Sequence, residues 1–330
     1  MKRIIAVAIM ILLAVSAFAS GEADKATSAD GTKQWVVGFS QIGSESEWRT
    51  ANTISVQNAF NDDPSFVLLY SDAQQKQENQ IKALRTFIAR KVDCIVFTAL
   101  VETGYGTVLQ EAKNANIPVI MIDRDVTKAD QHLRLAIMGS DFVKEGEKAG
   151  IWLGEYLKAQ GLDDGKKQIN IVELQGTTGS APAIDRKTGF ENILKTHSNW
   201  KITRSQTGNF TTSEGKAVME AFLKADKNIQ VLYAHNDGMG LGASQAIKEA
   251  GLVPGKDIII VGVDAVKGAF EAMIAGEMNC SVECSPLLGP QAVQAVRDLR
   301  DGKILPPRIW TIEGVFDQTN AKEAYPSRQY

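Results

Sequence analysis

Cysteine and histidine are scarce in this chain, and their scarcity argues against disulfide-stabilised and metal-dependent architectures. The 330 residues include three cysteines and three histidines. An odd cysteine count does not suit a disulfide framework. The histidines, His132, His197 and His235, are scattered without the short spacings of metal ligands. We therefore expect no disulfide framework, no metal site and no bound cofactor.

The three cysteines are better suited to a packed interior. Cys94 lies in a predicted buried strand, and Cys280 and Cys284 share another strand-like run. Four strand steps separate two Cα atoms by about 13 Å, which is too far for a disulfide bond. That exclusion would lapse if the two residues lay on a bent loop. We expect all three to be small buried side chains.

A surplus of basic charge is also missing. The chain has 36 basic and 39 acidic side chains, well mixed, for a formal net charge of −3. Nucleic-acid binding requires a concentrated basic face, so we expect no nucleic-acid partner. The 44% hydrophobic content is that of an ordinary globular protein, and the length favours about two domains.

Long apolar runs are absent except for one near the N-terminus. Lys2 and Arg3 precede an apolar stretch at 4–19, which ends in the small-x-small sequence Ala17-Phe18-Ala19. This arrangement is typical of a secretory signal peptide. Sixteen helical residues would reach about 24 Å, less than the roughly 30 Å of a bilayer core. We predict a signal peptide at 1–19, and no cysteine follows it to carry a lipid.

After a polar lead at 20–34, strand-like and helix-like segments alternate in two series. The first series predicts strands at 35–39, 66–70, 94–97 and 119–122, with its clearest helix at 75–91. The second predicts strands at 169–173, 202–206, 231–234, 258–263 and 278–283. Helices are predicted at 142–158, 184–196, 214–225, 239–250 and 268–275, and the tail adds a helix at 291–300 and a strand near 310–315.

Strands separated by helices imply parallel sheets. We therefore predict the α/β class, with two doubly wound parallel-sheet lobes. The first would comprise residues 35–139 and 286–313, and the second residues 140–285 and 314–330. Connections between the lobes would lie near 139–141, 283–286 and 312–315, forming a three-crossing hinge.

Polar and aromatic side chains follow the predicted strands. Ligands of open parallel sheets bind beyond the carboxyl ends of the strands. The segments found there are 41–48, 72–75, 123–125, 175–186, 208–210, 235–237 and residue Asp264. We expect them to converge on one cleft.

Five short motifs at these strand ends point to a family. They are Val36-Val37-Gly38-Phe39-Ser40-Gln41, Ile122-Asp123-Arg124, Val172-Glu173-Leu174-Gln175-Gly176, His235-Asn236-Asp237 and Val261-Gly262-Val263-Asp264. Over about residues 35–315 the chain resembles the ribose/galactose-type periplasmic binding proteins, the type I substrate-binding components of ABC sugar importers. The resemblance implies a monomeric periplasmic protein that carries a monosaccharide to a membrane permease.

Three further segments, 38–49, 74–83 and 183–187, are most similar to the galactofuranose-binding members of that family. The pattern of the ribose-binding members has two aromatic residues after the first strand, where this chain has Ser46-Glu47-Trp48-Arg49. The resemblance therefore implies galactofuranose or a related aldose as the ligand, in preference to ribose.

The resemblance also implies how the cleft would hold a sugar. Asp123 and Asp264 would accept hydrogen bonds from hydroxyl groups. Arg124 and Arg186 would donate them, and Asn236 would do both. The remaining candidates, of which the two aromatic rings would cover sugar C–H faces, are Phe210, Trp48, Ser44, Glu45, Arg49 and Asp185.

Each candidate has a purely structural alternative. Asp123 and Arg124 can form a surface ion pair, which contributes at most about 1 kcal/mol. Asp264 can cap the following helix. Arg186 can be a solvated residue at a helix start, and the two aromatic rings can belong to the core.

An enzyme is the main rival class. The run Gly238-Met239-Gly240-Leu241-Gly242 follows a predicted strand, but a dinucleotide fingerprint needs G-x-G-x-x-G, and Ala243 occupies the third glycine position. Glycines that allow close helix packing explain this run better. No phosphate loop and no G-x-S-x-G motif occurs. We predict a binding protein, with a periplasmic carbohydrate-active enzyme as the least favoured alternative.

Two other classes use the same fold. A sugar-responsive repressor would need an N-terminal helix-turn-helix, and this chain has an apolar run and a short polar lead there. A sugar-loaded partner of a chemoreceptor or histidine kinase is not distinguished from an importer component by the sequence, and one protein can serve both.

Overall fold

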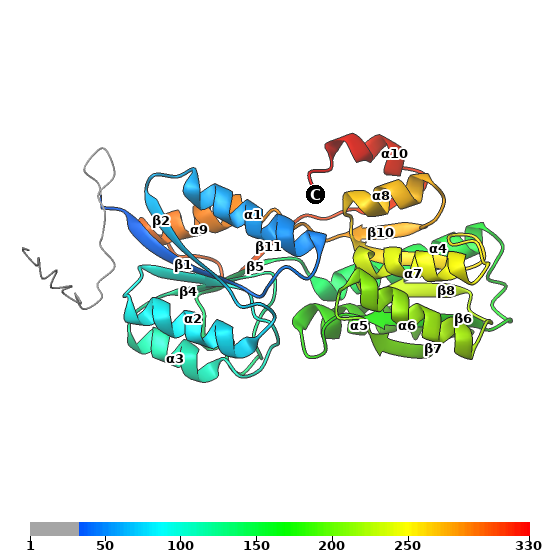
Figure 1. Ribbon diagram of the computed structural model, residues 1–330, viewed down its shortest axis with the longest axis horizontal. Helices are drawn as coiled ribbons and strands as arrows, with labels where there is room; N and C mark the ends of the chain where they lie inside the picture. Colours follow the sequence, from blue (N-terminus) through cyan, green and yellow to red (C-terminus); the bar gives the residue numbers. More distant parts are fainter. Residues whose placement is uncertain (1–32) are drawn as a thin grey trace, which may run out of the picture.

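The computed structural model describes residues 33–330, which form two α/β lobes side by side, each built around a six-stranded sheet (Figure 1). The predicted signal peptide and nearly all of the polar lead lie outside the described residues. No helix within 33–330 is both long enough and apolar enough to cross a membrane.

The first lobe contains a fully parallel sheet with the strand order β11-β5-β4-β3-β1-β2. Its strands are β1 (Trp35–Gln41), β2 (Phe66–Asp72), β3 (Cys94–Phe97), β4 (Val119–Ile122), β5 (Ala136–Gly139) and β11 (Arg308–Trp310). Its helices are α1 (Glu47–Asn61), α2 (Gln77–Ala89), α3 (Gly106–Asn114), α9 (Gly289–Arg300) and the 3₁₀ turn η1 (Gln131–Leu133).

Apolar side chains on both faces of each strand explain why this sheet is covered twice. Val36 packs in one hydrophobic cluster with α2 and α3, and Val37 packs in another with α1 and α9. Successive side chains of a strand point to opposite faces. A parallel sheet that is apolar on both faces therefore needs helices on both, and Figure 1 shows the two helix pairs on opposite sides.

The second lobe repeats the plan with the strand order β12-β10-β9-β8-β6-β7. Its strands are β6 (Ile169–Gln175), β7 (Trp200–Thr207), β8 (Val231–Ala234), β9 (Ile259–Asp264), β10 (Cys280–Glu283) and β12 (Val315–Asp317). Its helices are α4 (Phe142–Ala159), α5 (Ala181–Leu194), α6 (Thr212–Ala225), α7 (Asp237–Glu249), α8 (Lys267–Ile274), α10 (Ala321–Ala324) and the 3₁₀ turn η2 (Tyr325–Ser327).

The second sheet is parallel except at one edge, where β12 pairs antiparallel with β10. The predicted strand near 310–315 was wrong. The chain instead ends β11 at Trp310 in the first sheet and begins β12 at Val315 in the second. The residues between them must leave one sheet to reach the other, so they cannot form a strand of either.

The chain passes between the lobes three times. It leaves β5 for α4 through residues 140–141, leaves β10 for α9 through 284–288, and leaves β11 for β12 through 311–314. The two-lobed, three-crossing architecture expected from the sequence is present. All three cysteines are free and buried, as predicted.

Glycines bring two helix pairs of the second lobe into backbone contact. On α4, a Cβ added to Gly146 would lie 2.1 Å from the carbonyl oxygen of Arg186 on α5. On α7, a Cβ added to Gly242 would lie 2.1 Å from the carbonyl oxygen of Thr212 on α6, whereas one added to Gly240 would meet no atom nearer than 3.6 Å. The glycine-rich run thus permits close helix packing at Gly242.

This difference gives a prediction with an internal control. Gly242→Ala should lower the free energy of unfolding by about 2 kcal/mol, because the methyl group forces two backbones apart. Gly240→Ala, in the same helix, should leave it unchanged or raise it by up to about 1 kcal/mol through helix propensity. Urea denaturation of both variants checks this, and equal effects would contradict the packing argument.

Candidate functional site

A small cavity lies where the carboxyl ends of strands from both sheets face each other. Its lining comes from the start of α1, the turns after β4, β7, β8 and β9, the first turn of α5 and the connection after β10. The twelve lining residues are Glu45, Ser46, Trp48, Arg49, Asp123, Arg124, Pro182, Arg186, Phe210, Asn236, Asp264 and Cys284. The strand-end residues therefore converge as the parallel topology predicts.

Three of the lining residues have a backbone conformation that L-amino acids rarely adopt. The φ angles of Asp123, Phe210 and Asp264 are 61°, 63° and 123°. Such a conformation costs on the order of 1–3 kcal/mol at each residue and persists only where the surroundings impose it. The concentration of this strain around one cavity is typical of a functional site.

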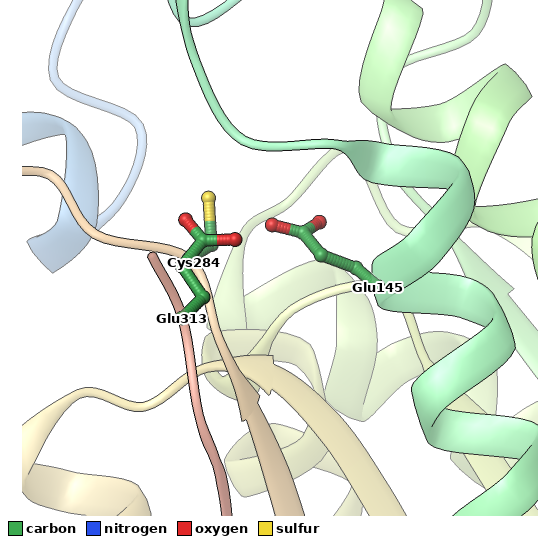
Figure 2. Close-up of side chains that lie close together, drawn as sticks. All are labelled: Glu145, Cys284 and Glu313. Carbon is green, nitrogen blue, oxygen red and sulfur yellow. The ribbon is translucent and has the colours of Figure 1, made fainter. Parts of the chain in front are cut away.

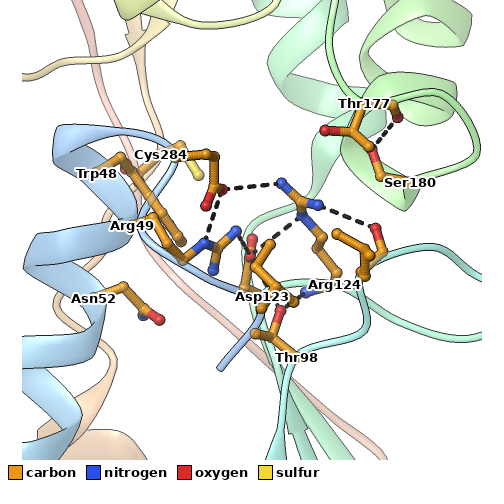
Figure 3. Close-up of polar contacts among 12 residues, drawn as sticks. Trp48, Arg49, Asn52, Thr98, Asp123, Arg124, Thr177, Ser180 and Cys284 are labelled. Atoms are coloured by element: carbon orange, nitrogen blue, oxygen red, sulfur yellow. Dashed lines mark hydrogen bonds and ion pairs between the residues drawn. The ribbon is translucent and has the colours of Figure 1, made fainter. Parts of the chain in front are cut away.

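The first lobe contributes two buried arginines held by two carboxylates (Figure 3). Arg49 Nη2 lies 2.7 Å from Asp123 Oδ2, and Arg49 Nε lies 3.1 Å from Glu45 Oε1. Arg124 Nη2 lies 3.6 Å from the same Glu45 oxygen, and its Nη1 donates to the carbonyl of Leu100 at 3.1 Å. All four ionic side chains are at most 5% exposed.

These arginines keep unused hydrogen-bond donors. Within residues 33–330, Arg49 Nη1 and Arg124 Nε are buried without a hydrogen-bond partner, and the carboxylate oxygen Asp123 Oδ2 lies 3.7 Å from Arg124 Nε. Burial, together with the nearby charge of Arg49, lowers the pKa of Arg124 to about 10, so its guanidinium stays charged at neutral pH. A buried donor left unpaired costs about 1–3 kcal/mol or more when charged. The cavity is therefore prepared to donate to an acceptor that the protein does not supply.

The second lobe contributes a third arginine. Arg186 Nε binds Glu145 Oε2 at 2.7 Å, its Nη1 donates to the carbonyl of His235 at 2.5 Å, and its Nη2 lies 3.5 Å from Asp264 Oδ1. Burial raises the pKa of Asp264, and the neighbouring Asp237 raises it further. Burial likewise raises the pKa of Glu145, to about 8. The carboxyl groups of Glu145 and Asp264 are thus both arranged around the guanidinium of Arg186.

Asn236 and the two aromatic residues serve the fold and the cavity together. Asn236 caps α7 by accepting from the amide of Met239 at 3.0 Å, and its amide donates to the carbonyl of Phe210 at 3.1 Å. The Phe210 ring lies 5.1 Å from the guanidinium of Arg124. Trp48 Nε1 donates to the carbonyl of Cys284 at 2.6 Å. Both rings also belong to a hydrophobic cluster, so their core and cavity roles coincide.

The two lobes touch beside this cavity. Arg124 of the first lobe stacks over Phe210 of the second, and the amide of Glu102 donates to the carbonyl of Gly179 at 3.0 Å across the lobes. These contacts describe a closed arrangement in which little solvent reaches the buried arginines.

Nine of the eleven predicted site residues line the cavity. Ser44 is exposed beside it, and Asp185 faces a neighbouring groove that also contains Glu102 and Asp125. Ser46 and Pro182 lie in the strand-end segments 41–48 and 175–186 but were not chosen as ligand contacts, and Cys284 was outside these segments. Ser46 caps α1, and Cys284 follows directly after β10, so a consistent search of strand ends would have included the cysteine.

Comparison with known proteins agrees with this geometry. The family model described as a periplasmic binding protein domain matches residues 37–304. The chain belongs to the periplasmic binding protein family. Members of this family bind substrates and do not transform them, and this chain is likewise a binding protein rather than an enzyme.

Relatives within the family are similar over nearly their full length. A galactofuranose-binding protein of Escherichia coli is 45% identical over 301 residues, covering 90% of this chain and 91% of its own. A Mycobacterium smegmatis protein solved with β-D-fucofuranose is 47% identical with a TM-score of 0.85, covering 90% and 95% of the two chains. The arabinose-transporter binding protein of Shewanella sp. ANA-3, solved with α- and β-L-arabinofuranose, is 48% identical with a TM-score of 0.83, covering 89% and 95%.

One buried pair behind the cavity gives this periplasmic binding protein a defined acid response. Glu173 Oε1 lies 3.1 Å from His235 Nε2, and its other oxygen accepts from Lys187 Nζ at 3.0 Å. Burial alone would raise the pKa of Glu173, but the hydrogen bond from His235 and the nearby positive charges lower it to about 2. The carboxylate therefore favours folding above the pKa of the unfolded chain, near 4.3, and loses this effect as the pH falls toward 2.

We predict that the difference in unfolding free energy between the parent protein and Glu173→Gln shrinks by about 1.5 kcal/mol from pH 5 to pH 3. Urea denaturation across that range measures the difference. Glu191→Gln is the matched control, because Glu191 contacts the same lysine from an exposed position, at 2.8 Å. An equal change in the control variant would contradict the assignment to Glu173.

Proposed function

We propose that this protein captures a monosaccharide in its furanose form, galactofuranose or a related aldose, between the two lobes and delivers it to the permease of an ABC importer. The observation that carries the proposal is the pair of buried arginine donors, Arg49 Nη1 and Arg124 Nε, that have no hydrogen-bond partner within residues 33–330.

The donors and acceptors around the cavity suit the edge of a sugar. A sugar hydroxyl accepts from a guanidinium and donates to a carboxylate, so adjacent hydroxyls match alternating arginines and acids. Arg49, Asp123 and Arg124 lie on one side of the cavity, and Arg186 and Asp264 on the other. The Phe210 ring supplies an apolar surface for C–H groups.

The furanose assignment draws on the relatives. One is named for galactofuranose, and two are solved with fucofuranose and arabinofuranose. The segment Ser46-Glu47-Trp48-Arg49, which departs from the ribose-binding pattern, supplies three lining residues of the cavity, Ser46, Trp48 and Arg49. Because a mismatched hydroxyl leaves a buried polar group unpaired at about 1–3 kcal/mol, this segment is suited to select against ribose.

Export to the periplasm, a monomeric state and closure of the lobes form part of the same proposal. An N-terminal signal peptide, cleaved after Ala19, would export the protein to the periplasm, where it acts as a monomer. Residues 35–139 with 286–313, and 140–285 with 314–330, would move as two bodies about the hinge and close over the sugar. Closure would create the contact between Glu102 and Gly179. We propose as a second partner a chemoreceptor or sensor kinase that recognises only the closed form.

A binding screen tests the proposed ligand directly. Sugars with a populated furanose form, including D-galactose, D-fucose and L-arabinose, should raise the melting temperature of the mature protein, and intrinsic tryptophan fluorescence should change without consumption of the sugar. Ribose should stabilise the protein less. Stabilisation by only an amino acid or a nucleotide would refute a sugar ligand.

We predict that Arg124→Ala weakens sugar affinity at least about 100-fold, because a hydrogen bond to a charged group contributes roughly 1.5–3 kcal/mol and the neighbouring carboxylates lose their partner. Titration calorimetry measures the affinity, and circular dichroism should show an unchanged fold. Arg85→Ala is the control, since the side chain of Arg85 is 53% exposed and pairs with Glu111 on the surface. Unaltered affinity in Arg124→Ala would remove Asp123 and Arg124 from the site.

We also predict that the bound sugar compacts the protein. X-ray scattering should give a smaller radius of gyration with a saturating sugar than without it, because closure brings the lobes together. Identical curves with and without a sugar that calorimetry shows to bind would exclude closure about the hinge.

A further inference from the structure

The three connections between the lobes meet at one carboxylate. Glu313 Oε1, in the third connection, accepts hydrogen bonds from the hydroxyl of Ser140 in the first, from the amide of Ser285 in the second at 3.1 Å, and from the hydroxyl of Thr311 at 2.8 Å. These bonds fix one oxygen of Glu313. Its other carboxylate oxygen is not needed to hold the connections together.

Two more acidic groups converge on this point. Glu145 on α4, Cys284 after β10 and Glu313 each offer one ligand atom, and these atoms all lie within 4.8 Å of one another. Figure 2 shows the carboxylate of Glu145 directed at the other two side chains. Glu145 and Cys284 are buried, and Glu313 is partly buried. We call these three side chains the hinge cluster.

Glu145 has unused capacity. Its Oε2 accepts from Arg186 Nε at 2.7 Å, while its Oε1 is buried and finds no hydrogen-bond partner anywhere in the described chain. Glu145 itself is 0% exposed. A carboxylate in this position can bind Arg186 with one oxygen and a cation with the other.

The charge of the hinge cluster is only partly compensated. Burial raises the pKa of Glu145, of Glu313 and of the Cys284 thiol, because each charged form is costly without a counter-charge. Arg186 compensates one carboxylate, and the charge of Lys148, whose Nζ donates to the backbone carbonyl of Glu313 at 2.9 Å, partly offsets the effect of burial on the pKa of Glu313. Protons or a bound cation must supply the remaining positive charge.

We propose that the hinge cluster is a binding site for Zn²⁺, with Cys284 Sγ, Glu145 Oε1 and the free oxygen of Glu313 as protein ligands and water in the fourth position. Zinc accepts thiolate and carboxylate ligands together in tetrahedral sites. Magnesium and calcium require oxygen ligands, and copper(I) prefers softer ones. This inference goes beyond sugar capture and does not depend on it.

The spacing of the ligand atoms suits this ion. Zinc bonds of about 2.0–2.3 Å place tetrahedral ligand atoms about 3.5 Å apart. The 4.8 Å spread of these atoms must therefore contract by about 1.3 Å when the ion binds. Because the thiol and both carboxyls must lose their protons, zinc affinity should rise with pH. The sequence contains no short motif that predicts the site, because its three ligands come from α4 and from two separate connections between the lobes.

Cobalt(II) provides a spectroscopic probe of the same site. Chelator-treated, reduced mature protein should develop a near-ultraviolet thiolate-to-cobalt charge-transfer band and the visible bands of tetrahedral cobalt on titration with Co²⁺. Zn²⁺ should then abolish both. Absence of the thiolate band would show that the hinge cluster holds protons only. Persistence of the band in excess Zn²⁺ would show that zinc does not occupy this site, and either result would overturn the proposal.

Variants identify the ligands. Cys284→Ser should remove the thiolate band and weaken zinc affinity at least about 100-fold, the upper range for loss of a supporting group. Cys280→Ser is the matched control, a buried thiol at the start of β10 that should retain both. Glu313→Gln keeps the thiol and should weaken zinc affinity even if Cys284→Ser does not fold. Full affinity in Cys284→Ser, or in Glu313→Gln, would refute this ligand set. Sugar calorimetry on the same samples tests the proposed function separately.

Discussion

The ion pairing of three buried arginines is the constraint on which the rest of the structure depends. Arg49, Arg124 and Arg186 are each at most 4% exposed. An isolated buried charge costs many kcal/mol, so each needs carboxylates at short range. Those carboxylates come from strand ends and helix starts of both lobes, and this requirement fixes the relative positions of α1, α4, α5 and the turns after β4 and β9.

Backbone strain and ion pairing support each other in this arrangement. The positive φ angles of Asp123 and Asp264 turn each carboxylate toward a guanidinium. The strain at each residue, of order 1–3 kcal/mol, is tolerated because the charges would otherwise be unpaired. A site built in this way is organised before a ligand arrives, which lowers the entropy that binding must overcome.

Much of the fold was predictable because its signals are local. Apolar strands followed by amphipathic helices specified most of the parallel strands. The segments selected by the rule for strand ends contain ten of the twelve lining residues of the cavity, whereas the choice of individual sugar contacts came from the family resemblance. Strand β5 was not predicted, and β11 was placed too far along the chain, because its three residues, Arg308–Trp310, are too few to show a periodicity. Cys284 was predicted as a small buried side chain, although the predicted connection near 283–286 already placed it at the hinge. Charge networks such as Glu145–Arg186 depend on tertiary contacts and carry no sequence signal.

The glycine contact between α4 and α5 has a consequence for how ligand preference evolves. Gly146 adjoins Glu145 and lies against the backbone of Arg186. The distance between helices α4 and α5 therefore determines the position of the Arg186 guanidinium. Substitutions at such outlying small residues would shift a cavity-lining arginine without altering any group that contacts the sugar. Relatives with identical cavity linings can therefore differ in the sugar they accept.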